Sequence, residues 1–255
     1  MTRYYLDTSA HIERWAGERA LKEQVASLLS DHAHATSTHV LREWKRIVEG
    51  GAADILNAYD EGDRDLPSLL ARLSQGYGRS PGQALRVLSM LVAGEKVDGA
   101  VSSRARLYMR TLARKLFERQ INVIRDGSDC ALARNEPVED GEGRWTLVHR
   151  CKKTDEICRQ VDFIGGQEDR ARAAGEALVQ QSDRSQDKKM GQTVLAGLKA
   201  PMDRKGVNCY GKTGDVSIAL ECGGDETLLT TDKSFDVIGP ALGLAVHRLG
   251  ATSPP

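Results

Sequence analysis

Apolar residues cluster in short runs at both ends of the chain, and these runs predict the strands of one sheet. Residues 4–6 and 32–35 are expected to form two strands near the N-terminus. Residues 227–231 form a β-branched and apolar run, which suits a buried parallel strand, and residues 244–249 are expected to form the last strand. Because helical segments separate these runs, the pattern predicts an α/β fold with a parallel sheet.

Helices are predicted between these strands from the spacing of apolar residues and from polar caps. Thr8 and Ser9 are suitable N-caps for the first helix, and Gly214 with Asp215 is expected to begin a later one. The pair Gly50-Gly51 is expected to end the third helix. The helices expected at the two ends of the chain cover residues 11–15, 18–29, 39–48, 216–221 and 234–242.

The middle of the chain is expected to be mainly helical. Its predicted helices cover residues 66–73, 81–91, 103–120, 154–159, 167–180 and 186–198. Residues 131–150 differ, because a Gly-rich turn between two short runs predicts a β-hairpin there. We therefore expect a core formed by residues 1–60 and 205–250, with residues 61–204 as an inserted helical lobe.

Composition places the chain among ordinary globular proteins. Of its 255 residues, 40% are hydrophobic and 28% are charged, and 36 basic residues balance 36 acidic ones. A nucleic-acid partner would therefore need a local basic patch, because the net charge is zero. The sequence has no apolar run of about 18 residues and no signal-peptide pattern, so a cytoplasmic protein without membrane contact is expected. Five cysteines, an odd number, argue against a disulfide framework.

Four carboxylates are candidates for one catalytic site. Asp7 and Asp232 each follow a predicted strand, and ligands of parallel α/β sheets bind at the carboxyl ends of strands. Asp215 is expected at a helix N-terminus, and Glu43 lies in a capped helix. Such a cluster requires a cation, and carboxylate oxygens favour Mg²⁺ or Mn²⁺. We expect the four groups to converge on one cation-sized space, where a metal-activated water would hydrolyse a phosphodiester.

Singly, each acid is ordinary, since an Asp after a strand is often only a helix cap. The combined order carries more information: Leu6-Asp7-Thr8-Ser9, then Glu43 with Arg46, then Gly214-Asp215-Val216-Ser217-Ile218-Ala219, then Thr230-Thr231-Asp232-Lys233-Ser234-Phe235. In this order the chain resembles the PIN-domain nucleases, the fold of the VapC-type toxin ribonucleases. The resemblance covers about the first 60 and the last 50 residues and leaves the middle unmatched.

The PIN resemblance implies a parallel sheet with helices on both faces. It also implies one or two divalent ions and the hydrolysis of RNA, less often DNA. By this resemblance the metal ligands are Asp7, Glu43, Asp215 and Asp232. Ser9 and Thr230 are expected to support them by hydrogen bonds, and Arg46 is expected to be a further supporting residue. An antitoxin or another regulatory protein, and a second copy of the chain, stay open as partners.

Basic residues in the middle segment are candidates for binding nucleic acid. Arg106, Arg110 and Arg114 follow at four-residue steps, so a helix would place them on one face. This stripe could hold phosphates, or it could be a solvated face with ion pairs. Lys212 could contact a phosphate or the leaving group, although an ordinary surface lysine has the same appearance.

A zinc site near the predicted hairpin is the weaker reading of four further residues. Cys130, His149, Cys151 and Cys158 carry suitable donor atoms, but no tight Cys-x-x-Cys pair is present. Free or buried thiols explain the same residues.

Two other functions must be weighed against a nuclease. A phosphatase of the haloacid dehalogenase type also has an Asp after its first strand, but it needs a second Asp where this chain has Ser9. A PIN-like scaffold that binds RNA or a protein without cutting is the main alternative. The sequence also leaves open a toxin, an RNA-processing enzyme and a phage-defence nuclease.

Overall fold

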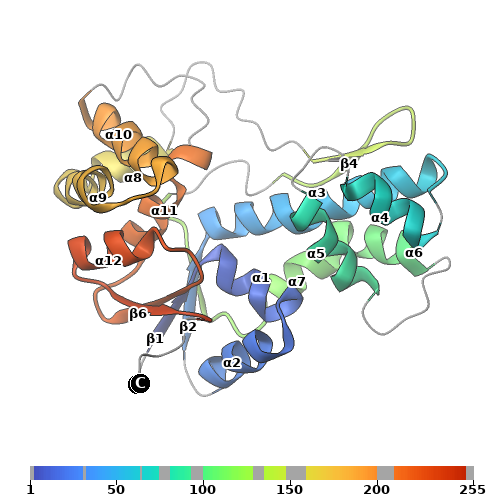
Figure 1. Ribbon diagram of the computed structural model, residues 1–255, viewed down its shortest axis with the longest axis horizontal. Coiled ribbons are helices and arrows are strands. Elements are labelled where there is room, and N and C mark those ends of the chain that lie inside the picture. The colour runs from blue at the N-terminus through green and yellow to red at the C-terminus, as the bar shows by residue number, and fades with distance from the viewer. Residues whose placement is uncertain are drawn as a thin grey trace.

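A parallel sheet forms the centre of the fold (Figure 1). The computed structural model describes residues 3–30, 33–63, 65–74, 81–92, 100–128, 135–147, 159–199 and 210–250. Five strands of this described part pair in the order β3-β2-β1-β6-β7, and every pair is parallel. The strands are β1 (Arg3–Leu6), β2 (His34–Ser37), β3 (Val123–Arg125), β6 (Glu226–Thr230) and β7 (Ala245–Arg248).

The strand order reverses at β1, which determines where a ligand can bind. The chain first builds outward from β1 through β2 to β3 and later returns to the other side of β1 with β6 and β7. Leu6, the last residue of β1, is paired with Leu229, the next to last residue of β6, so the carboxyl ends of the two strands lie side by side. At such a reversal the loops after the strands diverge and leave a crevice beyond the carboxyl ends.

Helices cover both faces of the sheet, as predicted. Their bounds are α1 (Thr8–Ala16), α2 (Arg19–Leu29), α3 (Thr38–Asp60), α4 (Leu66–Ser74), α5 (Pro81–Val92), α6 (Ala100–Leu107), α7 (Ala113–Glu118), α8 (Arg159–Gly165), α9 (Glu168–Gln181), α10 (Ser185–Lys199), α11 (Tyr210–Glu221) and α12 (Phe235–Leu242). Alternation along β1 divides the core: Tyr4 and Leu6 pack in the cluster that includes Val25 of α2. Tyr5 faces the other way, into the cluster shared by α3, α11 and α12.

Helix α3 is much longer than expected, because the glycine pair does not end it. Gly50 and Gly51 are buried inside a helix that continues to Asp60. A Cβ on Gly51 would lie 2.8 Å from Cγ2 of Val87, so α5 approaches the backbone of α3 closely at this point. The glycine therefore serves helix packing, and its expected role as a terminator was wrong.

The boundary expected between a core of residues 1–60 and 205–250 and an inserted lobe of residues 61–204 is crossed by one strand and by shared packing. Strand β3 comes from inside residues 61–204 and is an edge strand of the central sheet. One hydrophobic cluster runs from Tyr5 of the sheet through Trp44 to Phe117 of α7. The indole Nε1 of Trp44 donates a hydrogen bond to the carbonyl of Ala113 at 2.8 Å. The described middle of the chain is mainly helical, as predicted, but it shares its core with the sheet.

Several smaller predictions can be compared with the structure. The hairpin is confirmed, with β4 (Val138–Glu139) paired antiparallel to β5 (Trp145–Thr146). The helix expected over residues 103–120 contains a π-helical turn, Tyr108–Leu112, between α6 and α7. The helix expected over residues 154–159 lies almost entirely outside the described residues. None of the helices described is long and apolar enough to cross a lipid bilayer.

Candidate active site

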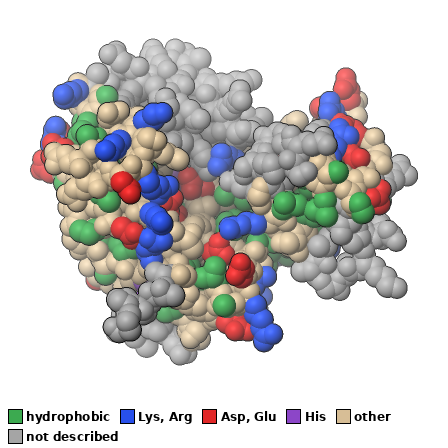
Figure 2. Space-filling view, viewed as in Figure 1, with side chains coloured by type: hydrophobic (Ala, Val, Ile, Leu, Met, Phe, Trp, Pro, Cys, Tyr) green, Lys and Arg blue, Asp and Glu red, His purple; other side chains and the backbone are tan. Residues whose placement is uncertain are grey.

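The four predicted acids line one cavity of about 570 Å³. Asp7 directly follows β1, Asp232 follows β6, and α3 and α11 contribute Glu43 and Asp215. The cavity therefore opens at the carboxyl ends of the two strands where the sheet order reverses. Figure 2 shows acidic side chains set back in the middle of this face, with basic side chains on both sides.

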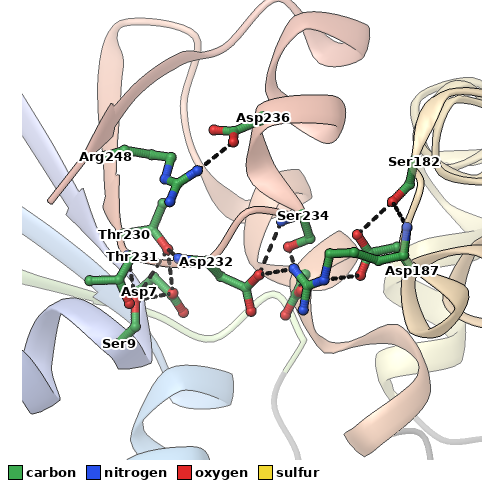
Figure 3. Close-up of polar contacts among 12 residues, drawn as sticks. Asp7, Ser9, Ser182, Asp187, Thr230, Thr231, Asp232, Ser234, Asp236 and Arg248 are labelled. Carbon is green, nitrogen blue, oxygen red and sulfur yellow. Dashed lines mark hydrogen bonds and ion pairs between the residues drawn. The ribbon is translucent and has the colours of Figure 1, made fainter. Parts of the chain in front are cut away.

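Asp7 is held by the two hydroxyl groups that were predicted to support it. Its Oδ2 accepts hydrogen bonds from Ser9 Oγ and Thr230 Oγ1, both at 2.8 Å (Figure 3). Its Oδ1 accepts one from the backbone N–H of Thr8. Asp7 is thus the N-cap of α1, a role that had been expected for Thr8 or Ser9. Burial, followed by the charge of Glu43, raises the pKa of Asp7 to about 6 despite these hydrogen bonds.

Glu43 is fixed by one contact from α1 and one from the preceding turn of its own helix, α3. The Thr8 hydroxyl donates to Oε2 of Glu43, and Nε2 of the buried His39 lies 3.4 Å from Oε1. Burial alone would raise the pKa of Glu43, but His39 and the Thr8 hydrogen bond bring it below its ordinary value. A Cβ on Gly214 would lie 3.2 Å from Glu43 Oε1, a tight contact, so glycine favours this close approach of α11 to α3.

Asp215 lies inside α11, which begins at Tyr210, and not at the helix N-terminus where it was expected. Its Oδ2 accepts a hydrogen bond from Ser234 Oγ at 2.6 Å. Burial, followed by the negative charges of Asp232 and Asp7, raises the pKa of Asp215 well above its ordinary value. The surroundings of Asp215 therefore favour its protonated form over its ionised form.

Asp232 has a cationic partner that the sequence did not suggest. Its Oδ1 accepts hydrogen bonds from the backbone N–H of Ser234 at 3.0 Å and from Nη1 of Arg184 at 2.8 Å (Figure 3). Burial would raise the pKa of Asp232, but the Ser234 N–H and the Arg184 guanidinium lower it below its ordinary value. The backbone N–H of Asp232 donates to Thr230 Oγ1 at 2.9 Å, which ties it to the support of Asp7.

The prediction that the four carboxylates converge on one cation-sized space is not met in its strict form. No three acidic, histidine or cysteine side chains within the described ranges form a group arranged to hold a metal ion. Asp7, Glu43, Asp215 and Asp232 line one cavity, yet each carboxylate is hydrogen-bonded to its own partners. Like charges repel, so pairing with separate partners stabilises the group.

The donor set nevertheless fits a hard divalent cation. All four groups are carboxylates, which supply the oxygen ligands that Mg²⁺ and Mn²⁺ prefer. Burial, followed by negative neighbours, raises the pKa of both Asp7 and Asp215, so added positive charge in this cavity would favour their ionised forms.

The middle of the chain forms part of the cavity wall, which the sequence did not predict. Gly82 and Arg86 of α5 line the cavity together with Gln186 and Met190 of α10. Arg46 of α3 lines it as well, as its role beside Glu43 implied. The cavity is therefore acidic at its floor and carries arginines from two helices.

Sequence reasoning missed several contacts of the site, and some of them had a visible signal. His39 precedes Glu43 by one helical turn, and Ser234 follows Asp232 by two residues. Thr8 lies beside Asp7 in the quoted motif. Arg184 had no such signal, because nothing in its local sequence indicates that it reaches Asp232.

The predicted arginine stripe faces solvent and does not line the cavity. Arg106 pairs with Asp60 at 3.4 Å and Arg114 with Glu118 at 2.7 Å, while Arg110 is exposed. The π-helical turn between Arg106 and Arg114 changes the rotation per residue, so the four-residue steps lose their common face.

Replacing Arg106, Arg110 and Arg114 together by Gln should leave nucleic-acid binding unchanged. The reason is that none of the three arginines lines the cavity. The fold should be unaffected as well, because Arg106 and Arg114 form surface ion pairs, which contribute only about 0–1 kcal/mol each to stability. The measurement is the slope of binding affinity against salt concentration. A slope reduced by up to about two units, the value for three lost single-strand phosphate contacts, would instead place substrate on this stripe.

The remaining candidates cannot be compared with the structure. Cys130, His149, Cys151 and Cys158 lie outside the described residues, as does the side chain of Lys212. Cys222 is a buried free thiol, and burial raises its pKa to about 12.

Comparison with known proteins gives no relative of this chain: no family model, no curated protein and no solved structure matches it. The function must therefore be argued from the site itself.

Proposed function

We propose that the chain is a divalent-metal-dependent nuclease that hydrolyses phosphodiester bonds, with RNA as the expected substrate. The observation that carries this proposal is the position of four carboxylates on one cavity at the point where the sheet order reverses. The same four acids, taken in their order along the chain, carry the resemblance to PIN-domain nucleases. Asp7, Glu43, Asp215 and Asp232 would hold the ion or ions.

The chemistry requires a cation and an orderly arrangement of its ligands. A bound Mg²⁺ or Mn²⁺ would supply Lewis-acid activation of water and would neutralise charge on the phosphodiester. Ser9 and Thr230 orient Asp7, Thr8 orients Glu43, and Ser234 orients Asp215. Such supporting hydrogen bonds commonly change metal affinity or activity by about 10–100-fold.

Arginines on the cavity wall offset the repulsion between an acidic floor and a polyanion. Arg46 and Arg86 line the cavity, and Arg86 also pairs with Glu13 at 3.0 Å. Positive side chains around a cleft raise the local concentration of an anionic substrate. The wall therefore suits a nucleic-acid backbone better than a neutral metabolite.

One observation favours the alternative of an RNA-binding scaffold that does not cut. Within the residues described, no three acidic groups converge as a metal site. A scaffold of this kind would bind RNA with or without a divalent ion and would cleave nothing.

A Mn²⁺ titration followed by electron paramagnetic resonance separates the two functions. The nuclease should bind Mn²⁺, and Asp215→Asn should weaken that binding, because it removes one carboxylate ligand. Incubation with labelled RNA and DNA of equal length should yield cleavage products only when Mg²⁺ or Mn²⁺ is present. Metal binding at background level, together with uncut RNA and DNA, would leave the scaffold as the function.

A further inference from the structure

Arg184 joins the acidic site from a part of the chain that the PIN resemblance does not cover. It lies in the turn between α9 and α10 and reaches Asp232 with Nη1 at 2.8 Å. Its side chain is 37% exposed, and the cavity is lined both by its partner Asp232 and by Gln186, two residues further along the chain. Asp215 also acts on it electrostatically, so two of the four acids favour the charged form of the guanidinium.

The turn holds this arginine by a chain of polar contacts (Figure 3). Asp187 is 2% exposed and lies 3.6 Å from Nε of Arg184. Ser182 Oγ donates to Asp187 Oδ2 at 2.8 Å and accepts the backbone N–H of Arg184 at 3.2 Å. Asp187 and Ser182 therefore fix both the backbone and the guanidinium of Arg184.

The contacts of Arg184 with Asp187 and Asp232 contribute little to the stability of the folded protein. A partly exposed ion pair contributes about 0–1 kcal/mol, whereas burying the carboxylate of Asp187 is costly unless its partners compensate. A guanidinium has five N–H donors in a planar fork, and the contacts with Asp187 and Asp232 involve only Nε and Nη1. Donors therefore remain for an incoming acceptor.

We propose that Arg184 is a phosphate-binding residue of the active site, with Asp187 and Ser182 as its positioning residues. The inference rests on the proposed function, because it assigns the contact with the backbone of the nucleic-acid substrate. Phosphate oxygens match the fork of an arginine in a bidentate manner. Arg184 would thus bind a phosphate adjacent to Asp232, while Arg46 and Arg86 line the cavity itself.

The test measures binding of a fluorescein-labelled single-stranded RNA by fluorescence anisotropy. It uses the full chain in the Asp7→Asn background with Mg²⁺ present, so that bound RNA stays intact. Arg184→Gln should raise the Kd about tenfold or more, the effect of losing one charge-assisted hydrogen-bond pair. It should also reduce the salt slope by about 0.7, the value for one single-strand phosphate contact.

Three further variants define the control and the mechanism. Arg172→Gln removes another arginine, one whose ion pair is with Glu168 on α9 and not with an acid of the cavity, and should leave Kd and slope unchanged. Arg184→Lys should keep the salt slope but raise the Kd, because the charge remains and the fork is lost. Asp187→Asn should raise the Kd less than Arg184→Gln and should also keep the slope. Thermal melting of each variant shows that it is folded.

The outcomes distinguish this inference from the proposed function. Equal Kd and slope for Arg184→Gln and Arg172→Gln would overturn the inference, even if the wild-type chain cleaves RNA. Tighter binding of RNA by Arg184→Gln would overturn it too, because Arg184 would then only obstruct the site. A wild-type chain that cuts no nucleic acid, combined with loss of RNA binding in Arg184→Gln, would support the phosphate contact and reject the nuclease.

Discussion

Asp7→Asn should reduce nucleic-acid cleavage by at least about a hundredfold, since loss of a residue that merely supports a metal ligand already costs about 10–100-fold. Asp7 is the acid held by Ser9, Thr230 and the N–H of Thr8, so its position is the most tightly defined of the four. Initial rates in saturating Mn²⁺ measure the effect. Asp225→Asn is the matched control, because Asp225 is 72% exposed and precedes β6 at the opposite end of the sheet.

The same variant should keep its fold, and its stability should depend less on pH. Because burial and Glu43 raise the pKa of Asp7 to about 6, the folded state binds this proton more tightly than the unfolded state does. In a metal chelator, the wild-type chain should therefore lose stability as pH rises from about 4 through about 6. Asparagine removes this contribution, although its amide cannot accept all three hydrogen bonds, a loss of about 1 kcal/mol.

Melting temperatures at pH 5 and pH 8 measure this effect. Retained cleavage beside an unchanged melting temperature would contradict the role of Asp7 as a ligand. An equal pH dependence in Asp7→Asn and wild type would contradict the assignment of the raised pKa to this residue.

The acids could be located from sequence because their signals are local. Asp7 follows an apolar strand, and Asp232 follows a β-branched one, so each marks the carboxyl end of a strand. Parallel strands then bring both to the same edge of the sheet. The supports Ser9 and Thr230 lie within two residues of these acids, and local spacing was sufficient for them too.

Features that depend on distant contacts had no comparable signal. Gly51 looks like a helix terminator until the side chain of Val87 is placed against it. Strand β3 has three residues and no buried one, so alternation of apolar and polar positions could not reveal it. Arg184 acquires its role only through a contact with Asp232, far along the chain. In each case the contacting residue lies too far along the chain for the local pattern of apolar and polar residues to indicate the contact.

The second large effect is expected from Trp44→Ala, a change in the core that joins the sheet to the middle of the chain. Trp44 is fully buried, and its ring lies 6.0 Å from that of His11 and 6.2 Å from that of Phe117. Truncating a buried Trp costs about 3–5 kcal/mol, because it leaves a cavity and removes apolar contacts. The hydrogen bond to the Ala113 carbonyl is lost as well.

For a chain of this size, that loss should lower the melting temperature by roughly 10 °C. Trp15→Ala is the control, since Trp15 is only partly buried at the edge of the same cluster and should cost less. Urea unfolding followed by circular dichroism tests the coupling between the two parts. Because β3 is a strand of the central sheet and Phe117 packs in the core of that sheet, Trp44→Ala should shift one common transition to lower urea. Two transitions, with only one displaced, would show that residues 61–204 unfold independently.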